Sequence, residues 1–259
     1  MPRYFIELSY KGTAYSGFQI QQNSNTIQAE ITKAIKIISG IDFELTGSSR
    51  TDAGVHALQN YFHFDSDIEY INWKGVKNEQ QLIYKLNAIL PCDIAIKCIY
   101  FVPELANCRF DAISREYRYY VYQFKNPFLE TTAYYYPYKL NIELLNQAAE
   151  LMYSFTDFTS FSKRNTQVKT FNCKIIESKW EIQGEKLVYY IKANRFLRGM
   201  VKAMVATQLK VGREILSIQQ FIKILEERDS TKAFFSVPSR GLFLEKVNFS
   251  NDFFNRKSS

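Results

Sequence analysis

The sequence predicts an α+β protein made of two halves that share one order of elements. Over roughly the first hundred residues, hydrophobic positions follow strand and helix periods in the order strand, helix, strand, strand, helix, strand. The same order recurs in the remainder, and 46% hydrophobic residues in a chain of 259 is sufficient for two cores. This order is typical of ferredoxin-like (βαββαβ) domains. We therefore expect two such domains with antiparallel sheets, at residues 1–105 and 106–259, and a ligand cleft between them.

The elements of the first half follow from local patterns. Residues 3–10 alternate between two faces, which predicts a half-buried strand. Thr26 precedes apolar residues at helical spacing that end at Gly40, which predicts a helix. The other elements expected here are strands at 41–46, 55–65 and 94–102 and a helix at 79–90 that Pro91 stops.

The second half is expected to contain a hairpin and three helices. The turn Gln183-Gly184-Glu185 joins two strand-like runs. Ser217 and Gln220 have the spacing of a capping box, which marks the start of a helix. The expected strands are 114–124, 171–182, 186–194 and 242–249, and the expected helices are 141–154, 196–211 and 217–227.

Composition favours a polyanionic partner and a reducing compartment. The chain has 33 Lys and Arg against 26 Asp and Glu, a net charge of +7, and 16% aromatic residues, which can stack on unpaired bases. Its four cysteines form no C-x-x-C pair, so we expect no metal site. No apolar signal region or membrane-spanning run is found in the sequence, and we expect a cytoplasmic protein without membrane contact.

A polar loop from Gly47 to Ala57 has a single acid, Asp52, at its centre. Its small neighbours let a flat ligand approach the carboxylate. A carboxylate that acts as a nucleophile must stay ionised while partly desolvated, so it requires a cation or hydrogen bonds from elsewhere in the chain. Arg50 is suited to bind an anion or to fill vacated space. The alternative is that Thr51 or Asp52 only caps a turn.

Two segments of the second half combine aromatic and basic residues. Alternation along the strand at 114–124 places Tyr117 and Arg118 on opposite faces, and an ordinary aromatic strand is the alternative interpretation. In the predicted helix at 196–211, Arg198 and Lys202 are four residues apart and share one face. A charged face of this kind is solvated in most proteins.

The run Arg50-Thr51-Asp52-Ala53-Gly54-Val55-His56-Ala57 resembles the signature loop of the TruA family of tRNA pseudouridine synthases. The segments around Tyr117 and Lys202 are similar to two further motifs of that family, and the resemblance covers nearly the whole chain. It implies that Asp52 is the catalytic nucleophile and that Tyr117 reaches the target base. At the position of Lys202 the family commonly has an arginine that pairs with the aspartate, and lysine keeps the charge but not the two-pronged geometry.

The resemblance also implies a substrate and an assembly. The expected reaction isomerises uridines at positions 38 to 40 of the tRNA anticodon arm, on a flipped base, without metal or organic cofactor and in a homodimer. The side chains expected to bind the substrate are Arg50, Thr51, Arg118, Arg195 and Arg198.

Two other classes of protein share part of these features. A non-catalytic RNA-binding protein with two RRM-like halves would also be basic and aromatic, but we do not find the exposed Gly and Phe pattern that it requires. A zinc-dependent base deaminase requires an H-x-E motif, and neither His56 nor His63 has a glutamate two residues on. Release of the uridine C5 hydrogen distinguishes pseudouridine formation from both alternatives.

Overall fold

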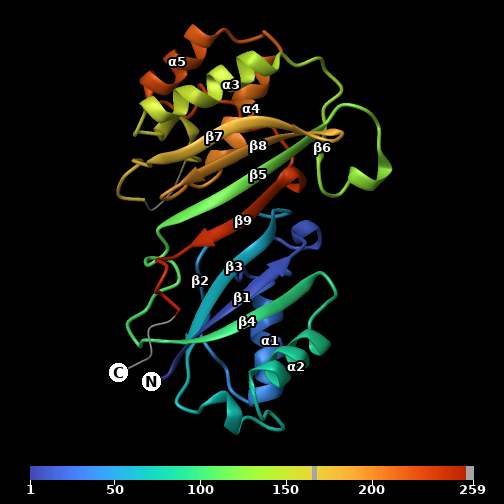
Figure 1. Cartoon of the computed structure of the whole chain (residues 1–259), viewed down its shortest axis with the longest axis vertical. Helices are drawn as coiled ribbons and strands as arrows, with labels where there is room; N and C mark the ends of the chain where they lie inside the picture. Colours follow the sequence, from blue (N-terminus) through green and yellow to red (C-terminus); the bar gives the residue numbers. More distant parts are fainter. Residues whose placement is uncertain (165–167, 255–259) are drawn as a thin grey trace. The chain divides into compact units, whose positions relative to one another are not determined.

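The computed structural model describes residues 1–164 and 168–254, and Figure 1 shows their elements. The chain divides into two compact units, which we call unit 1 (Met1–Ile113 and Leu244–Ser259) and unit 2 (Ser114–Phe243). Each unit combines helices with mainly antiparallel strands, so the mixed α and β class predicted from the sequence is confirmed. No helix in the described part of the chain is long and apolar enough to cross a membrane.

Unit 1 has a sheet in the order β4-β1-β3, with both pairings antiparallel and the short β2 paired to β3. Its elements are β1 (Arg3–Tyr10), α1 (Ile27–Ser39), β2 (Thr46–Gly47), β3 (His56–Asp65), α2 (Glu79–Ile89), β4 (Ile94–Val102) and most of β9 (Leu242–Asn248). Alternation along β1 directs Tyr4 to one face, where its ring contacts Phe64 and Phe101. Phe5 lies on the other face and packs against Phe253.

The helices of unit 1 begin where the sequence places capping residues. The Thr26 side chain accepts a hydrogen bond from the Ala29 N–H at the start of α1, and Asn78 does the same for Gln81 at the start of α2. The apolar face of α1 is buried, which agrees with the helical spacing of its isoleucines.

Unit 2 has a sheet in the order β5-β8-β7 with antiparallel pairings. Its elements are β5 (Ser114–Tyr122), β6 (Tyr134–Tyr135), α3 (Ile142–Leu151), β7 (Ile175–Gln183), β8 (Lys186–Ala193), α4 (Met200–Gly212) and α5 (Ile218–Glu227). In Figure 1, α3, α4 and α5 lie together within unit 2, and α3 also packs against β7. The capping box of Ser217 and Gln220 is present at the start of α5, as the sequence predicts.

The prediction of a strand at 41–46 is wrong for most of that segment. Only Thr46–Gly47 pair with β3. Leu45 is buried and Phe43 packs against Phe64 and Trp73, so the alternating apolar residues reflect burial of side chains without a ladder of backbone hydrogen bonds.

Other boundaries also differ from the expected ones: β7 begins at Ile175 instead of residue 171, β5 ends at Tyr122 instead of 124, and α3 ends at Leu151 instead of 154. Helix α4 begins at Met200, four residues later than expected, because Gly199 takes the left-handed conformation at the N-cap, with φ of 74°. The division into units falls after Ile113, whereas the sequence predicted 105/106, and most of β9 belongs to unit 1. A hydrogen bond from the Ile113 N–H to the Asn248 carbonyl, 2.8 Å long, ties these two segments together.

Candidate active site

The loop that contains Asp52 lies in unit 1, between β2 and β3. Asp52 is half-buried, Arg50 is exposed, and Thr51 is buried. A tight turn follows Asp52, closed by a 3.1 Å hydrogen bond from the Val55 N–H to the Asp52 carbonyl. The loop therefore combines an accessible arginine with a carboxylate that is partly withdrawn from water.

The segment from residue 12 to 18 supports this loop through its backbone. The Phe18 N–H donates to the Thr51 carbonyl at 3.1 Å, and the Gly12 N–H donates to His56 Nδ1 at 3.1 Å. The backbone at Gly12 is so close to the backbone at Val55 that an added Cβ would collide with the Val55 carbonyl. Glycine is therefore required at residue 12, and the backbone on both sides of Asp52 is fixed by contacts distant in sequence.

Tyr117 lies in unit 2 on β5, opposite Ile191 of β8. It is half-buried, and its ring meets the Phe196 ring edge to face, with centroids 5.0 Å apart and planes at 83°. The structure thus brings the strand motif and the segment before α4 together. Phe196 is a residue that the sequence reasoning missed as a partner of Tyr117, although it lies within a segment that resembles the family.

Arg118 follows Tyr117 on the strand, and its side chain lies on the opposite face. Its guanidinium is 5.9 Å from the centre of the Tyr190 ring. Burial and a hydrogen bond with Glu116 raise the pKa of the Tyr190 hydroxyl, so Tyr190 stays neutral beside the arginine. This position separates Arg118 from the face of β5 that presents Tyr117.

The start of α4 carries the other predicted basic residues. Arg198 is exposed and Arg195 half-buried, both in the turn before the helix. Since α4 begins at Met200, the prediction that Arg198 and Lys202 share a helical face is wrong. Lys202 lies in the first turn of α4, where its Nζ donates to Ser239 Oγ at 3.1 Å.

Lys202 lies at the N-terminal end of α4. The first turn of α4 contains no acidic residue, and no side chain caps its N-terminus. The backbone dipoles of a helix add partial positive charge at its N-terminal end. Lys202 and Lys210 are the two residues of the 13-residue helix that are not fully buried. The sequence analysis did not single out Ser239, which contacts the Lys202 ammonium in the structure.

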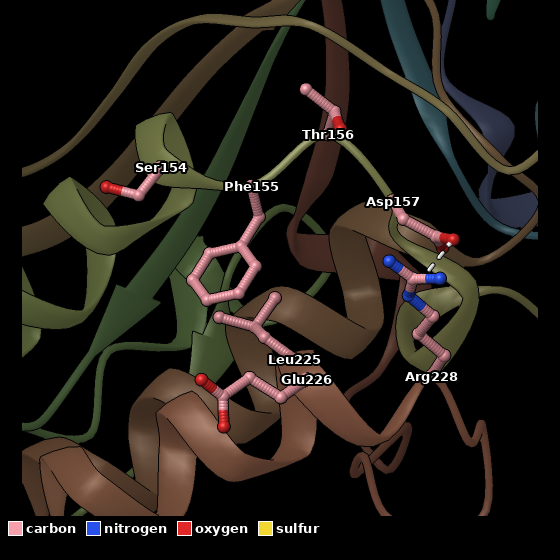
Figure 2. A pocket seen from close by; sticks show the side chains of 7 residues that line it. All are labelled: Ser154, Phe155, Thr156, Asp157, Leu225, Glu226 and Arg228. Carbon is pink, nitrogen blue, oxygen red and sulfur yellow. Dashed lines mark ion pairs between the residues drawn. The ribbon is translucent and has the colours of Figure 1, made fainter.

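Figure 2 shows a separate cavity of unit 2, with a volume of about 300 Å³. Its polar lining includes Asp157 and Arg228, which form an ion pair at 3.4 Å. None of the side chains predicted from the sequence lines this cavity. Among residues 1–164 and 168–254, no three His, Cys, Asp or Glu side chains gather in a way that could hold a metal ion.

Comparison with known proteins identifies the family. A family model described as tRNA pseudouridine synthase matches residues 8–111 and 149–250. A tRNA pseudouridine synthase A of Parabacteroides distasonis is 43% identical over 255 residues, 98% of each chain. Proteins of the same name from Bacteroides thetaiotaomicron (41% identity, 100% of this chain and 94% of the relative) and Staphylococcus saprophyticus (36%, 95% and 90%) are also similar.

These matches define an enzyme of the isomerase class. The chain belongs to the family of tRNA pseudouridine synthases, which confirms the resemblance seen in the loop motif. The two alternative classes, a zinc deaminase and a non-catalytic RNA-binding protein, are thereby set aside. Asp52 and Lys202 fall within the matched ranges, whereas Tyr117 and Arg118 lie between them.

Proposed function

We propose that the protein isomerises uridine to pseudouridine at positions 38 to 40 of the tRNA anticodon arm, with Asp52 as the nucleophile. The observation that carries this proposal is the Asp52 loop itself: a half-buried carboxylate among small residues, on a backbone fixed from both sides. Membership in the family supports the reaction, and the net charge of +7 favours a polyanionic substrate.

The reaction replaces the carbon–nitrogen bond between base and ribose with a carbon–carbon bond. The bond between uracil N1 and ribose C1′ breaks, the base rotates, a bond from C5 to C1′ forms, C5 loses its proton and N1 gains one. The base must leave the helical stack before this can occur. Asp52 attacks the sugar or the ring, or assists removal of a ribose proton. Arg50, with its exposed side chain two residues away, binds the backbone or fills the space that the base vacates.

Two residues of unit 2 complete the proposed chemistry. Tyr117, braced by the edge-to-face contact with Phe196, offers a flat ring for stacking and a hydroxyl for transfer of the C5 proton. Lys202 supplies the positive charge for Asp52, and the hydrogen bond of its ammonium to Ser239 helps to hold the side chain in place. Arg195 and Arg198, in the turn before α4, serve as phosphate contacts. Arg118 lies on the face of β5 opposite Tyr117, so a contact of Arg118 with the substrate would be separate from that of Tyr117.

The test is release of hydrogen from C5-labelled tRNA by Asp52→Asn. We expect release to fall to background while tRNA affinity is retained, because phosphate contacts dominate binding. Asp42→Asn is the matched control, since Asp42 is an acid of the same unit in an exposed ion pair with Lys36. Retained release by Asp52→Asn would remove Asp52 from the mechanism. Transcripts with a single uridine at position 38, 39 or 40 test the site.

The remaining features of the proposal concern architecture and cellular context. Each unit is proposed to be a ferredoxin-like half, which the order β4-β1-β3-β2 and the order β5-β8-β7 support. The enzyme is proposed to be a cytoplasmic homodimer that needs no cofactor. Light scattering tests the dimer, and turnover after dialysis against a chelator tests the independence from metal.

A further inference from the structure

We infer that Asn60 and Tyr10 are positioning residues that hold the Asp52 carboxylate in its reactive place. They act through Ser49 and Thr51, the two residues on either side of Arg50. The inference rests on the proposed role of Asp52, and it assigns a task to two buried polar side chains that do not themselves belong to the loop.

Asn60 lies in the middle of β3 and is 0% exposed. Its Oδ1 accepts a hydrogen bond from the Tyr61 N–H at 2.9 Å, which determines the orientation of the amide group. The amide nitrogen must then face the loop, where it donates to the Ser49 carbonyl at 3.0 Å and to the Tyr10 hydroxyl at 3.2 Å. The amide oxygen and both amide hydrogens of Asn60 are therefore used, and the strand holds the loop directly.

Tyr10 extends this contact to the next part of the loop. It ends β1, is 5% exposed, and its hydroxyl lies 2.7 Å from Thr51 Oγ1. The same hydroxyl accepts from the Asn60 amide, and either hydroxyl can donate in the bond between Tyr10 and Thr51. The ring is held against Phe18, with centroids 6.1 Å apart. The hydroxyl thus links the residue before Asp52 to the centre of the sheet.

The consequence is that Ser49 and Thr51 are both anchored while Arg50 projects to solvent between them. The sequence predicted Thr51 as a substrate-binding residue, but its hydroxyl is buried and bonded to Tyr10. A catalytic group that is displaced by about 1 Å can lose about 100-fold in rate. Loss of this link should therefore slow the chemical step without weakening the binding of tRNA.

The first variant is Tyr10→Phe, which keeps the ring and removes only the bridging hydroxyl. Its matched control is Tyr61→Phe, which removes another buried hydroxyl of the same unit, one that donates to Glu7 at 2.8 Å. We expect kcat for C5 hydrogen release to fall about 10- to 100-fold in Tyr10→Phe, with the Kd for tRNA within about twofold of the parent. Tyr61→Phe should lower the melting temperature by about as much as Tyr10→Phe does, and its kcat should stay within about twofold of the parent.

The second pair of variants separates positioning from folding. Thr51→Val keeps the shape and removes the hydroxyl that meets Tyr10, whereas Thr51→Ser keeps the hydroxyl. We expect Thr51→Val to match the loss of kcat in Tyr10→Phe and Thr51→Ser to restore most of it. The double variant Tyr10→Phe with Thr51→Val should be no slower than either single variant, because both remove the same hydrogen bond.

The possible failures are distinguishable. If Asp52→Asn is inactive and Tyr10→Phe turns over like Tyr61→Phe, the positioning role is overturned and the role of Asp52 stands. Equal kcat for Thr51→Val and Thr51→Ser overturns it as well, even if Tyr10→Phe fails to fold. If Asp52→Asn keeps full C5 hydrogen release, the proposed function and the positioning role fail together.

Discussion

Acidification should weaken unit 1 through one buried histidine, His63 on β3. Its side chain is 6% exposed, and its ring stacks on Phe5 with centroids 5.5 Å apart. The Cys108 N–H donates to His63 Nδ1 at 3.4 Å, and the Cys108 sulfur lies 3.1 Å from the same nitrogen. An Nδ1 that accepts from a backbone N–H requires the neutral imidazole, so protonation removes a hydrogen bond and buries a charge.

The magnitude follows from the pKa of His63. This pKa is lowered from 6.5 to about 4, mainly by burial and then by the positive charge of Arg3, while Asp65 and Asp111 act in the opposite direction. The unfolded chain therefore binds the proton at a higher pH than the folded chain. The stabilisation is complete above about pH 6.5 and is lost as pH falls toward 4, with a total of about 3 kcal/mol. Between pH 7 and pH 5 the expected loss in the free energy of unfolding is about 2 kcal/mol.

The assay compares urea unfolding of the parent and of His63→Asn at pH 7 and pH 5. Asparagine keeps an acceptor near the position of Nδ1 and does not titrate. Of the two tryptophans, Trp73 lies in unit 1 and Trp180 in unit 2, so both proteins carry Trp180→Phe and fluorescence then reports on unit 1 alone. The variant should be less stable at pH 7 and lose about 2 kcal/mol less on acidification. Parallel losses in the two proteins would refute the assignment to His63.

Three further changes test the proposed chemistry and one helix. Tyr117→Phe keeps stacking and deletes the hydroxyl, so single-turnover rates should fall about 10²- to 10⁴-fold at unchanged tRNA affinity; parental rates would leave Tyr117 only a stacking role. Lys202→Met should lower the rate far more than Lys202→Arg, since charge is the requirement, and a larger loss in Arg198→Met would move the ion-pair role there. Ser217→Ala should lower the free energy of unfolding by about 1 kcal/mol in urea titrations without affecting turnover, since it removes the cap of α5.

The periodic elements of the fold were predictable because one short-range pattern determines each of them. The bounds of β1 and β4 agree with alternation in the sequence, and α1 begins after its capping threonine. The segment 41–46 shows the limit of this reasoning. Alternating burial requires only that side chains reach a core, whereas a strand also requires a partner backbone, and the half-buried Phe43 packs against rings without one.

The predicted start of α4 was wrong for a different reason. The apolar spacing continues from Phe196 through the segment before Met200, so the period alone predicts an unbroken helix. Gly199 interrupts the helix because its φ is positive, and the spacing of hydrophobic residues does not indicate such a backbone conformation. That one residue moves Arg198 off the helix and leaves Lys202 in its first turn, next to Ser239.

The residues of the candidate site also differ in whether local sequence marks them. Asp52 could be proposed from the sequence because it stands in a run of consecutive residues that resembles a motif of the family, and Arg50 because it lies in the same loop. Asn60 and Tyr10 could not, since their hydrogen bonds join positions 11 and 41 residues apart and no local spacing marks them. Thr51 shows why this matters for function: a hydroxyl beside a catalytic carboxylate is suited equally to bind substrate or to brace the loop. Its burial against Tyr10 favours the second role, and that burial exists only once β1 and β3 are paired.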